Sequence, residues 1–283
     1  MKFNKTPLNI ENQIEILKDK YKINCKDENI LSYYLVHCNY YKLSGYKIFF
    51  EKLNKEIYFE EIINLYEFDR ELKILFLDYI ERIETSIKSV FAYHLTTKYK
   101  NSHIHLDKKL FINEKFYKIG LDKLEKSYLE SKEIFAKHFQ TKYEEQTPPL
   151  WVSVEFMTLG EISKWYKNLN LVDRKDISKI YNIKERYLWS FLFHLTEIRN
   201  ISAHNSRLWN RNLSKGFQIP HNLKIYPSKS FKIYHTIMML DYVLKEIKVT
   251  DFLDKILNLI NKYNIPLKYM GFSKNIKGLK YEI

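Results

Sequence analysis

Apolar residues recur along most of the chain at three- and four-residue steps, the spacing that places them on one face of an α-helix. Residues 9–22 show this clearly, because Ile10, Ile14, Leu17 and Tyr21 would line a single face. The strongest such pattern covers residues 184–212, which we expect to form one helix. The same spacing predicts further helices over 27–34 and the residues that follow, over 58–98 as one or two long helices, from Trp151 onward, over 174–183 and over 229–263.

A few stretches interrupt this pattern. Residues 99–148 are rich in Lys and Tyr and less periodic, and they predict an insertion with its own helices that ends in a turn at two consecutive prolines. Gly45 marks a break or a close backbone approach. Pro220 and Pro227 bound a loop, and the last twenty residues predict a loosely held tail.

The scarcity of turn-forming residues favours an all-α fold class. Only 6 Gly and 6 Pro occur among 283 residues. Proteins built from many short strands need frequent turns, and turns use Gly and Pro. Long helices joined by short loops need far fewer, and a hydrophobic content of 45% is ample for their core.

The formal net charge of +13 points to a polyanionic partner, either a nucleic acid or an anionic membrane. A genome rich in AT would also raise the Lys count, so the seven arginines are more informative than the lysines. Three of them, Arg199, Arg207 and Arg211, fall within thirteen residues. The planar guanidinium grips a phosphate through two hydrogen bonds, which Lys cannot do.

Several classes of protein are disfavoured. Cys25 and Cys38 are the only cysteines, and they form neither a CxxC pair nor a cluster with histidines. We therefore expect no metal site, no cofactor and no oxidising compartment. The first residues lack the apolar core of a signal peptide, and no apolar stretch approaches the ~20 residues of a membrane span. We expect a cytoplasmic protein without membrane contact.

A helical wheel of residues 191–211 divides the segment into two faces. One face is apolar, and the other carries only arginine, asparagine, histidine and one alanine. Arg199 and His204 border this polar arc roughly 140° apart, so they need not converge within one chain. The apolar face consists of Phe191, Leu195, Ile198, Ile201, Leu208 and Trp209, and the polar arc of Arg199, Asn200, His204, Arg207, Asn210 and Arg211.

These polar residue types suit the cleavage of RNA. Paired carboxylates are absent from the face, which disfavours metal-assisted and glycosidase chemistry. Histidine can transfer protons near neutral pH, and arginine can stabilise charge on a phosphate. RNA brings its own nucleophile, the 2′-OH, so no nucleophilic side chain is needed. Such a face is also often only a solvated surface, and the wheel alone leaves both interpretations open.

Five stretches of the chain, including the one with the polar arc, resemble sequence blocks of a known family. RNISAHNSRLWNR at 199–211 resembles the RNxxAHxxRxWN motif of the Abi-like (AbiD/AbiF) abortive-infection family. Four other stretches resemble blocks of that family in the same order. They are NYYKLSGY at 39–46 (NYxRLSGY), LYEFDRELK at 65–73 (YxFDRxLR), ERIETSIKS at 81–89 (IExxxR, with Lys88 for Arg) and WVSVEFMTLGEIS at 151–163 (WxxxExxxFGxLS, with Leu159 for Phe).

The resemblance implies membership of the HEPN superfamily, whose proteins are all-α and built on a four-helix bundle. Its ribonucleases generally act without metal as dimers that pair two motif helices in one composite site. We expect a HEPN-type helical bundle with a helical insertion and C-terminal helices. The predicted parts are 1–98 (N-terminal helices and first half of the bundle), 99–148 (insertion), 149–215 (second half, with the motif helix) and 216–283 (C-terminal helices and tail).

The resemblance also implies the site. Carried onto this sequence, the motif makes Arg199, Asn200 and His204 the catalytic residues. Arg207 and Asn210 also match it, and together with Arg211 they would support RNA binding. Glu84 would reach the motif helix as a second-shell partner, although a structural ion pair is the favoured role.

Other residues in the matched stretches have structural interpretations. Asp69–Arg70 and Arg82–Glu84 would form ion pairs that orient the bundle. Trp209 would pack in the core. The tyrosines of the first block, Tyr40, Tyr41 and Tyr46, could stack on RNA bases, but packing is favoured.

Three hypotheses follow. The first is a homodimeric endoribonuclease of a phage-defence or toxin–antitoxin system, whose partners are substrate RNA and a cognate structured small RNA that holds it in check. The second is a catalytically silent protein that binds a structured RNA. The third is a purely structural helical dimer. The intact Arg-Asn-x3-His pattern favours the first.

Overall fold

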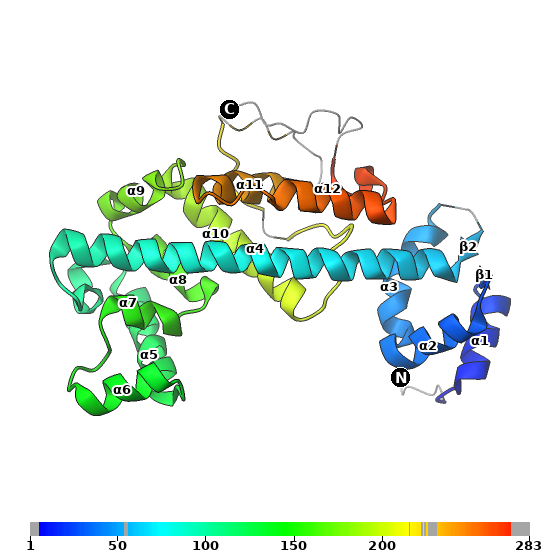
Figure 1. The fold of residues 1–283 in the computed structure, drawn as a ribbon, viewed down its shortest axis with the longest axis horizontal. Helices are drawn as coiled ribbons and strands as arrows, with labels where there is room; N and C mark the ends of the chain where they lie inside the picture. The colour runs from blue at the N-terminus through cyan, green and yellow to red at the C-terminus, as the bar shows by residue number, and fades with distance from the viewer. Residues whose placement is uncertain are drawn as a thin grey trace. The chain divides into compact units, whose positions relative to one another are not determined.

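The computed structural model describes residues 6–53, 56–214, 216–221, 223, 225 and 231–272. Within this part of the chain, twelve α-helices are joined by turns and short 3₁₀ segments (Figure 1). The only strands there are two-residue segments, β1 (Ile23–Asn24) and β2 (Ile57–Tyr58), which pair in parallel. The predicted all-α fold class is confirmed.

The chain divides into two compact units. The first contains residues 1–73 and 257–265, and the second contains 74–256 and 266–283. The boundary lies inside α4 (Phe59–Tyr99), a single helix of 41 residues. The pattern over 58–98 left one or two long helices open, and the structure has one. The four-part division drawn from the sequence stays a prediction.

The first unit contains α1 (Ile10–Asp19), α2 (Glu28–Cys38), α3 (Tyr40–Glu51) and the start of α4. The break between α2 and α3 falls at Asn39, whose φ of 63° turns the chain and whose side chain accepts from the backbone N–H of Tyr41. Gly45 lies inside α3, and a Cβ there would meet nothing within 4 Å. The prediction of a break or close approach at Gly45 was therefore wrong.

Two of the matched stretches meet in the core of this unit. The Tyr46 hydroxyl donates to Asp69 Oδ2 at 2.7 Å, and Lys73 Nζ lies 3.4 Å from the same oxygen. All three side chains are buried. A buried ion pair is tolerated when hydrogen bonds satisfy its remaining atoms, and the tyrosine supplies one here.

The second unit contains the rest of α4 and most of the other helices. α5, α6 and α7 are grouped together (Figure 1), and the first two fall within the predicted insertion. The bounds are α5 (Glu114–Glu130), α6 (Ile134–Lys142), α7 (Leu150–Ser153), α8 (Leu159–Asn168), α9 (Leu171–Lys179), α10 (Glu185–Ala203) and α11 (Ile233–Glu246), with α12 (Phe252–Tyr263) beginning here.

Helix α10 is the packing centre of the second unit. It contacts α8 and α9, and Figure 1 shows α8 and α10 side by side. Leu188, Leu195 and Ile198 on its inner face are fully buried. Gly160 of α8 makes the close approach possible, because a Cβ there would stand 3.1 Å from Thr196 Cγ2 of α10.

Helix α10 ends at Ala203, so the predicted helix over 184–212 was wrong in its last turns. The N–H of Ser206 donates to Ile201 O (2.9 Å) and that of Asn205 to Ser202 O (3.1 Å). Asn205 has a φ of 50°. This is a Schellman motif, in which a left-handed residue closes the helix. Glycine is the usual residue at that position, so without it the sequence did not indicate where the helix ends.

The left-handed conformation of Asn205 yields a stability prediction. Replacing Asn205 by Gly or by Ala removes the same side chain, but a Cβ at positive φ is strained. We expect Asn205→Gly to have a free energy of unfolding about 1 kcal/mol higher than Asn205→Ala. Urea denaturation followed by circular dichroism measures the difference.

Ser206 is the matched control, because it is also exposed but is not among the residues with positive φ. At position 206 the Gly variant should be no more stable than the Ala variant, since Gly has no conformational advantage over Ala there. Equal stabilities for the two Asn205 variants would contradict the assignment of this helix end.

Candidate functional site

The three predicted catalytic residues lie at the C-terminal end of α10. Arg199 and Asn200 are in its final turns, and His204 is the residue that caps the helix. All three are exposed. Arg199 Nη1 lies 3.4 Å from Asn200 Oδ1, and the N–H of His204 donates to the carbonyl oxygen of Asn200 at 3.0 Å. The structure therefore brings them together on one accessible helix end.

The predicted supporting residues lie in the loop that follows. Arg207 is half-buried and Arg211 is exposed, and Arg211 Nη1 lies 3.4 Å from the carbonyl oxygen of Arg207. Leu208 and Trp209 anchor this loop, because both are fully buried. The predicted packing of Trp209 is confirmed. The wheel assigned the buried residues correctly, although the segment after Ala203 is not helical.

Lys232 was missed by sequence reasoning. Its Nζ donates to Asn210 Oδ1 at 2.9 Å and to the Asn210 carbonyl oxygen at 3.2 Å, and thereby holds a residue whose φ is 53°. Burial, and then the positive charge of Arg207, lower the pKa of Lys232. Gly271 (φ 94°) packs on its stem, where a Cβ would stand 2.7 Å from Lys232 Cβ. Lys232 is one lysine among many, so no sequence signal distinguished it.

This contact changes the interpretation of Asn210. Its side-chain oxygen is engaged inside the protein, so its visible contribution is to fix the path of the loop. A contact of Asn210 with RNA stays a prediction.

Glu84 pairs with Lys88, one turn further along α4, at 3.0 Å, and both side chains are mostly buried. This is the i,i+4 geometry that the IExxxR block implies, with Lys in place of Arg. A second-shell contact of Glu84 with the motif helix stays a prediction.

The specific ion pairs predicted for the neighbouring blocks were wrong. Arg70 pairs with Glu67 at 2.7 Å, three residues earlier on its own helix. Arg82 pairs with Asp78 at 3.2 Å, four residues earlier. Helical geometry explains both, because residues three or four apart lie on the same side of a helix whereas residues one or two apart do not face each other.

The tyrosines of the first block have different environments. Tyr46 is buried, Tyr40 is half-buried and stacks on Tyr21 with centroids 6.2 Å apart, and Tyr41 is 73% exposed. Packing therefore explains Tyr46 and Tyr40, which is the role that the sequence analysis favoured. Of the three tyrosines, only Tyr41 is exposed enough to meet an RNA base.

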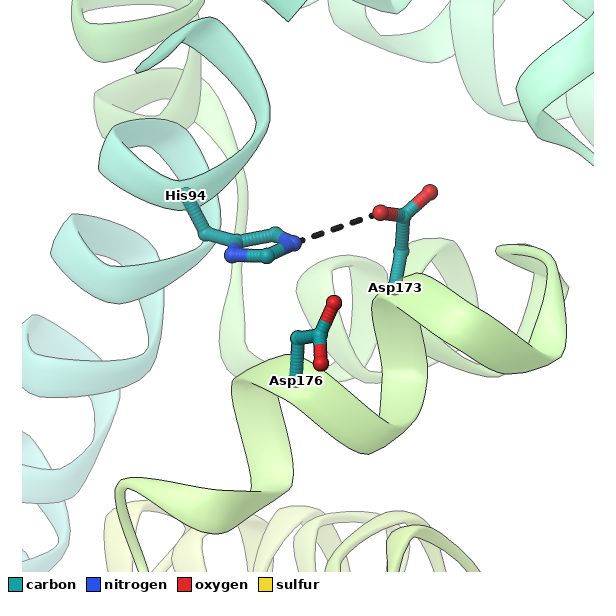
Figure 2. A group of neighbouring side chains, drawn as sticks. All are labelled: His94, Asp173 and Asp176. Atoms are coloured by element: carbon teal, nitrogen blue, oxygen red, sulfur yellow. Dashed lines mark hydrogen bonds and ion pairs between the residues drawn. The ribbon is translucent and has the colours of Figure 1, made fainter. Parts of the chain in front are cut away.

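One group of side chains has the residue types of a metal site. His94 of α4 and Asp173 and Asp176 of α9 bring ligand atoms within 4.8 Å of one another (Figure 2). His94 Nε2 lies 3.2 Å from Asp173 Oδ1. Lys98 Nζ already occupies the cation position, however, at 2.7 Å from Asp173 Oδ1 and 3.2 Å from Asp176 Oδ2.

The remaining contacts of Asp173 support a structural role for this cluster. The Tyr99 hydroxyl donates to Asp173 Oδ2 at 2.9 Å, and Asn170 Nδ2 donates to the same oxygen at 2.6 Å. Burial alone would raise the pKa of Asp173, but these hydrogen bonds, with that from Lys98 the strongest, hold it below its usual range. The cluster ties α9 to α4.

The chain can now be placed in a family. The fold and site are those of an all-α protein with a basic motif at a helix end. The sequence profile of the Abi-like protein family matches residues 33–210, well over half of the chain. The chain therefore belongs to the Abi-like family, and membership suggests a part in abortive infection, a defence against phage. No curated protein and no solved structure matches it.

The matched region contains the first four motif stretches and all but the last residue of the fifth, and it ends at Asn210. In the part of the chain that the structure describes, none of the helices combines the length and apolar composition needed to cross a bilayer.

Asp173→Asn should lower the free energy of unfolding by about 2–3 kcal/mol at pH 7, because the buried carboxylate accepts hydrogen bonds from Lys98, Tyr99 and Asn170 that a neutral amide accepts less well. The native pKa of Asp173 is lowered, so its contribution is complete above the ordinary carboxyl pKa of about 3.9 and is lost as the pH falls through the native value. Urea denaturation at pH 7 and pH 3 measures both effects.

Asp176→Asn is the control, on the same helix but at a partly exposed residue, and it should lower the free energy of unfolding by less than about 1 kcal/mol. The assignment fails if the two variants are equally stable.

Lys232→Met keeps the stem that packs on Gly271 but removes the donor to Asn210. We expect it to lower the free energy of unfolding by about 1–2 kcal/mol and to speed amide hydrogen exchange in residues 204–211. Lys126→Met removes only an exposed ion pair with Glu130 and serves as the control. Unchanged exchange in the loop would show that Lys232 does not position it.

Proposed function

We propose that this protein is a metal-independent HEPN-type endoribonuclease of a phage-defence or toxin–antitoxin system. The observation that carries the proposal is the joint exposure of Arg199, Asn200 and His204 at one helix end, beside a loop with two further arginines. Membership of the Abi-like family supports the defence role.

The residue types match the steps of RNA cleavage. The 2′-OH of the substrate attacks the adjacent phosphorus, and the 5′-oxygen leaves. His204 removes the proton from the 2′-OH or protonates the leaving oxygen. Arg199 holds the phosphate and stabilises its developing charge, while Asn200 orients a hydroxyl or a phosphate oxygen. The products are a 2′,3′-cyclic phosphate and a 5′-OH.

The position at a helix C-terminus makes the arginines necessary. The last carbonyl groups of a helix carry a partial negative charge, which attracts cations and repels phosphate. Arg199 lies in the last turns of α10 and Arg207 and Arg211 lie in the loop that follows, so all three add positive charge near this end. A phosphate bound here therefore depends on guanidinium groups, unlike a phosphate at a helix N-terminus.

A homodimer would complete the site. The motif segment offers one histidine per chain, whereas efficient cleavage uses one group as base and another as acid. A second copy of α10 would bring the second His204. A cognate structured RNA bound to the basic surface would hold this centre in check in the cytoplasm until infection.

His204→Ala and Arg199→Ala should each slow cleavage at least 100-fold. His138→Ala, at an exposed histidine of α6, should leave it unchanged. The assay uses protein freed of bound nucleic acid at high salt, labelled RNA and excess EDTA. Fragments should carry 5′-OH ends that a polynucleotide kinase can label.

Two outcomes count against the nuclease. If wild-type protein leaves all RNA intact but binds a structured RNA, the alternative of a catalytically silent RNA-binding protein is correct. If cleavage requires added metal, the mechanism is wrong. The growth of cells expressing wild type or His204→Ala tests the same distinction, since only the active enzyme should arrest growth.

A further inference from the structure

Lys232 places a half-buried positive charge directly on the loop that follows α10. The N–H of Leu213 donates to the carbonyl oxygen of Phe231 at 3.0 Å, which holds the chain before α11 beside the end of this loop. Lys232 Nζ donates to two neutral oxygens of Asn210, at 2.9 and 3.2 Å. Within the part of the chain that the structure describes, Lys232 forms no ion pair with a carboxylate.

The surroundings of Lys232 disfavour its positive charge. Burial, and then the charge of Arg207, lower its pKa. Lys232 is also the residue that precedes the first turn of α11, an end of the helix where the backbone carries a partial positive charge. A charge taken out of water is normally offset by a partner of opposite sign. Asn210 supplies only neutral acceptors, so an anion from outside the chain would stabilise this lysine.

Two cations can meet one anion here. An ammonium group has three N–H donors, and Asn210 accepts from two of them, which leaves one for a ligand. Arg207 is half-buried on the same loop, and its charge acts directly on Lys232. Neighbouring cations repel each other, whereas an anion that accepts from both would favour their charged forms.

We propose that Lys232 and Arg207 bind a phosphate of the RNA strand other than the one that is cleaved. The inference rests on the proposed function, because it gives the same site a second contact with its substrate. Arg207 follows His204 by three residues, so their Cα atoms are at most about 11 Å apart. One RNA strand can therefore reach both positions. The net charge of +13 also fits a polyanion better than an isolated small anion.

The salt dependence of RNA binding tests this role, because its slope counts the phosphates that a protein neutralises. Full-length wild-type protein is titrated into a fluorescein-labelled, single-stranded 2′-O-methyl RNA, which lacks the nucleophile for cleavage. The titration is repeated over a range of KCl concentrations. We expect Lys232→Met to reduce the slope of log K against log[KCl] by about 0.7, the value for one phosphate, and to weaken binding about 5-fold at low salt.

Asn210→Ala is the matched control for a purely structural role of Lys232. It removes the side-chain acceptor and loosens the same loop, but it leaves both positive charges in place. Its slope should therefore equal that of the wild type, even if its affinity falls. Lys232→Arg keeps the charge and should keep the slope. Lys126→Met removes an exposed lysine of α5 and should change neither value. Circular dichroism checks that each variant is folded.

Three results would overturn the proposal. In the first, Lys232→Met keeps the wild-type slope, or the wild type does not bind the oligonucleotide at all. In the second, Asn210→Ala reduces the slope as much as Lys232→Met, because the lysine then acts only through the loop. In the third, calorimetry shows that inorganic phosphate binds in a Lys232-dependent way while the slope for RNA is unchanged, because the ligand is then a free phosphate.

Cleavage of unmodified RNA is scored separately, so the two proposals can fail independently. If the wild type cleaves RNA and Lys232→Met keeps the slope, the nuclease stands and the second phosphate contact is rejected. If Lys232→Met reduces the slope and no variant cleaves RNA, the phosphate contact stands and belongs to a silent RNA-binding protein.

Discussion

The termination of α10 at Asn205 is the constraint on which the candidate site depends. Two hydrogen bonds and one left-handed residue stop the helix directly after the motif's alanine. The chain then turns so that Leu208 and Trp209 enter the core of the second unit. The loop that carries Arg207 and Arg211 is thereby anchored directly after the helix end that carries His204.

The matched stretches outside the motif mainly provide contacts inside one unit or the other. Tyr46 and Asp69 join two stretches in the first unit. In the second unit, Gly160 lets α8 approach α10, and Glu84 pairs with Lys88. These contacts give the residues involved a structural role within their own units. Within the motif, Asn210 belongs to the same group, because Lys232 holds it.

Sequence reasoning succeeded where one periodicity governs a long segment. The helical conformation of the residues in α4 and the inner face of α10 follow from the spacing of apolar residues alone, although that spacing left open whether α4 is one helix or two. Sequence reasoning missed the chain reversals at Asn39 and Asn205, which both have positive φ. Glycine is the usual signal for such a position, whereas asparagine adopts positive φ only in some contexts. Sequence reasoning could not find Lys232 either. That contact joins residues 22 positions apart through a loop whose path depends on tertiary packing.

The electrostatics of the helix end decide how the site can work. The carbonyl groups at the end of α10 attract cations and repel anions. In the proposed nuclease, guanidinium groups would hold the RNA phosphate at this helix end. That requirement suits a centre shared between two chains, because a second α10 would double the positive charge around one phosphate and provide the second proton-transfer group.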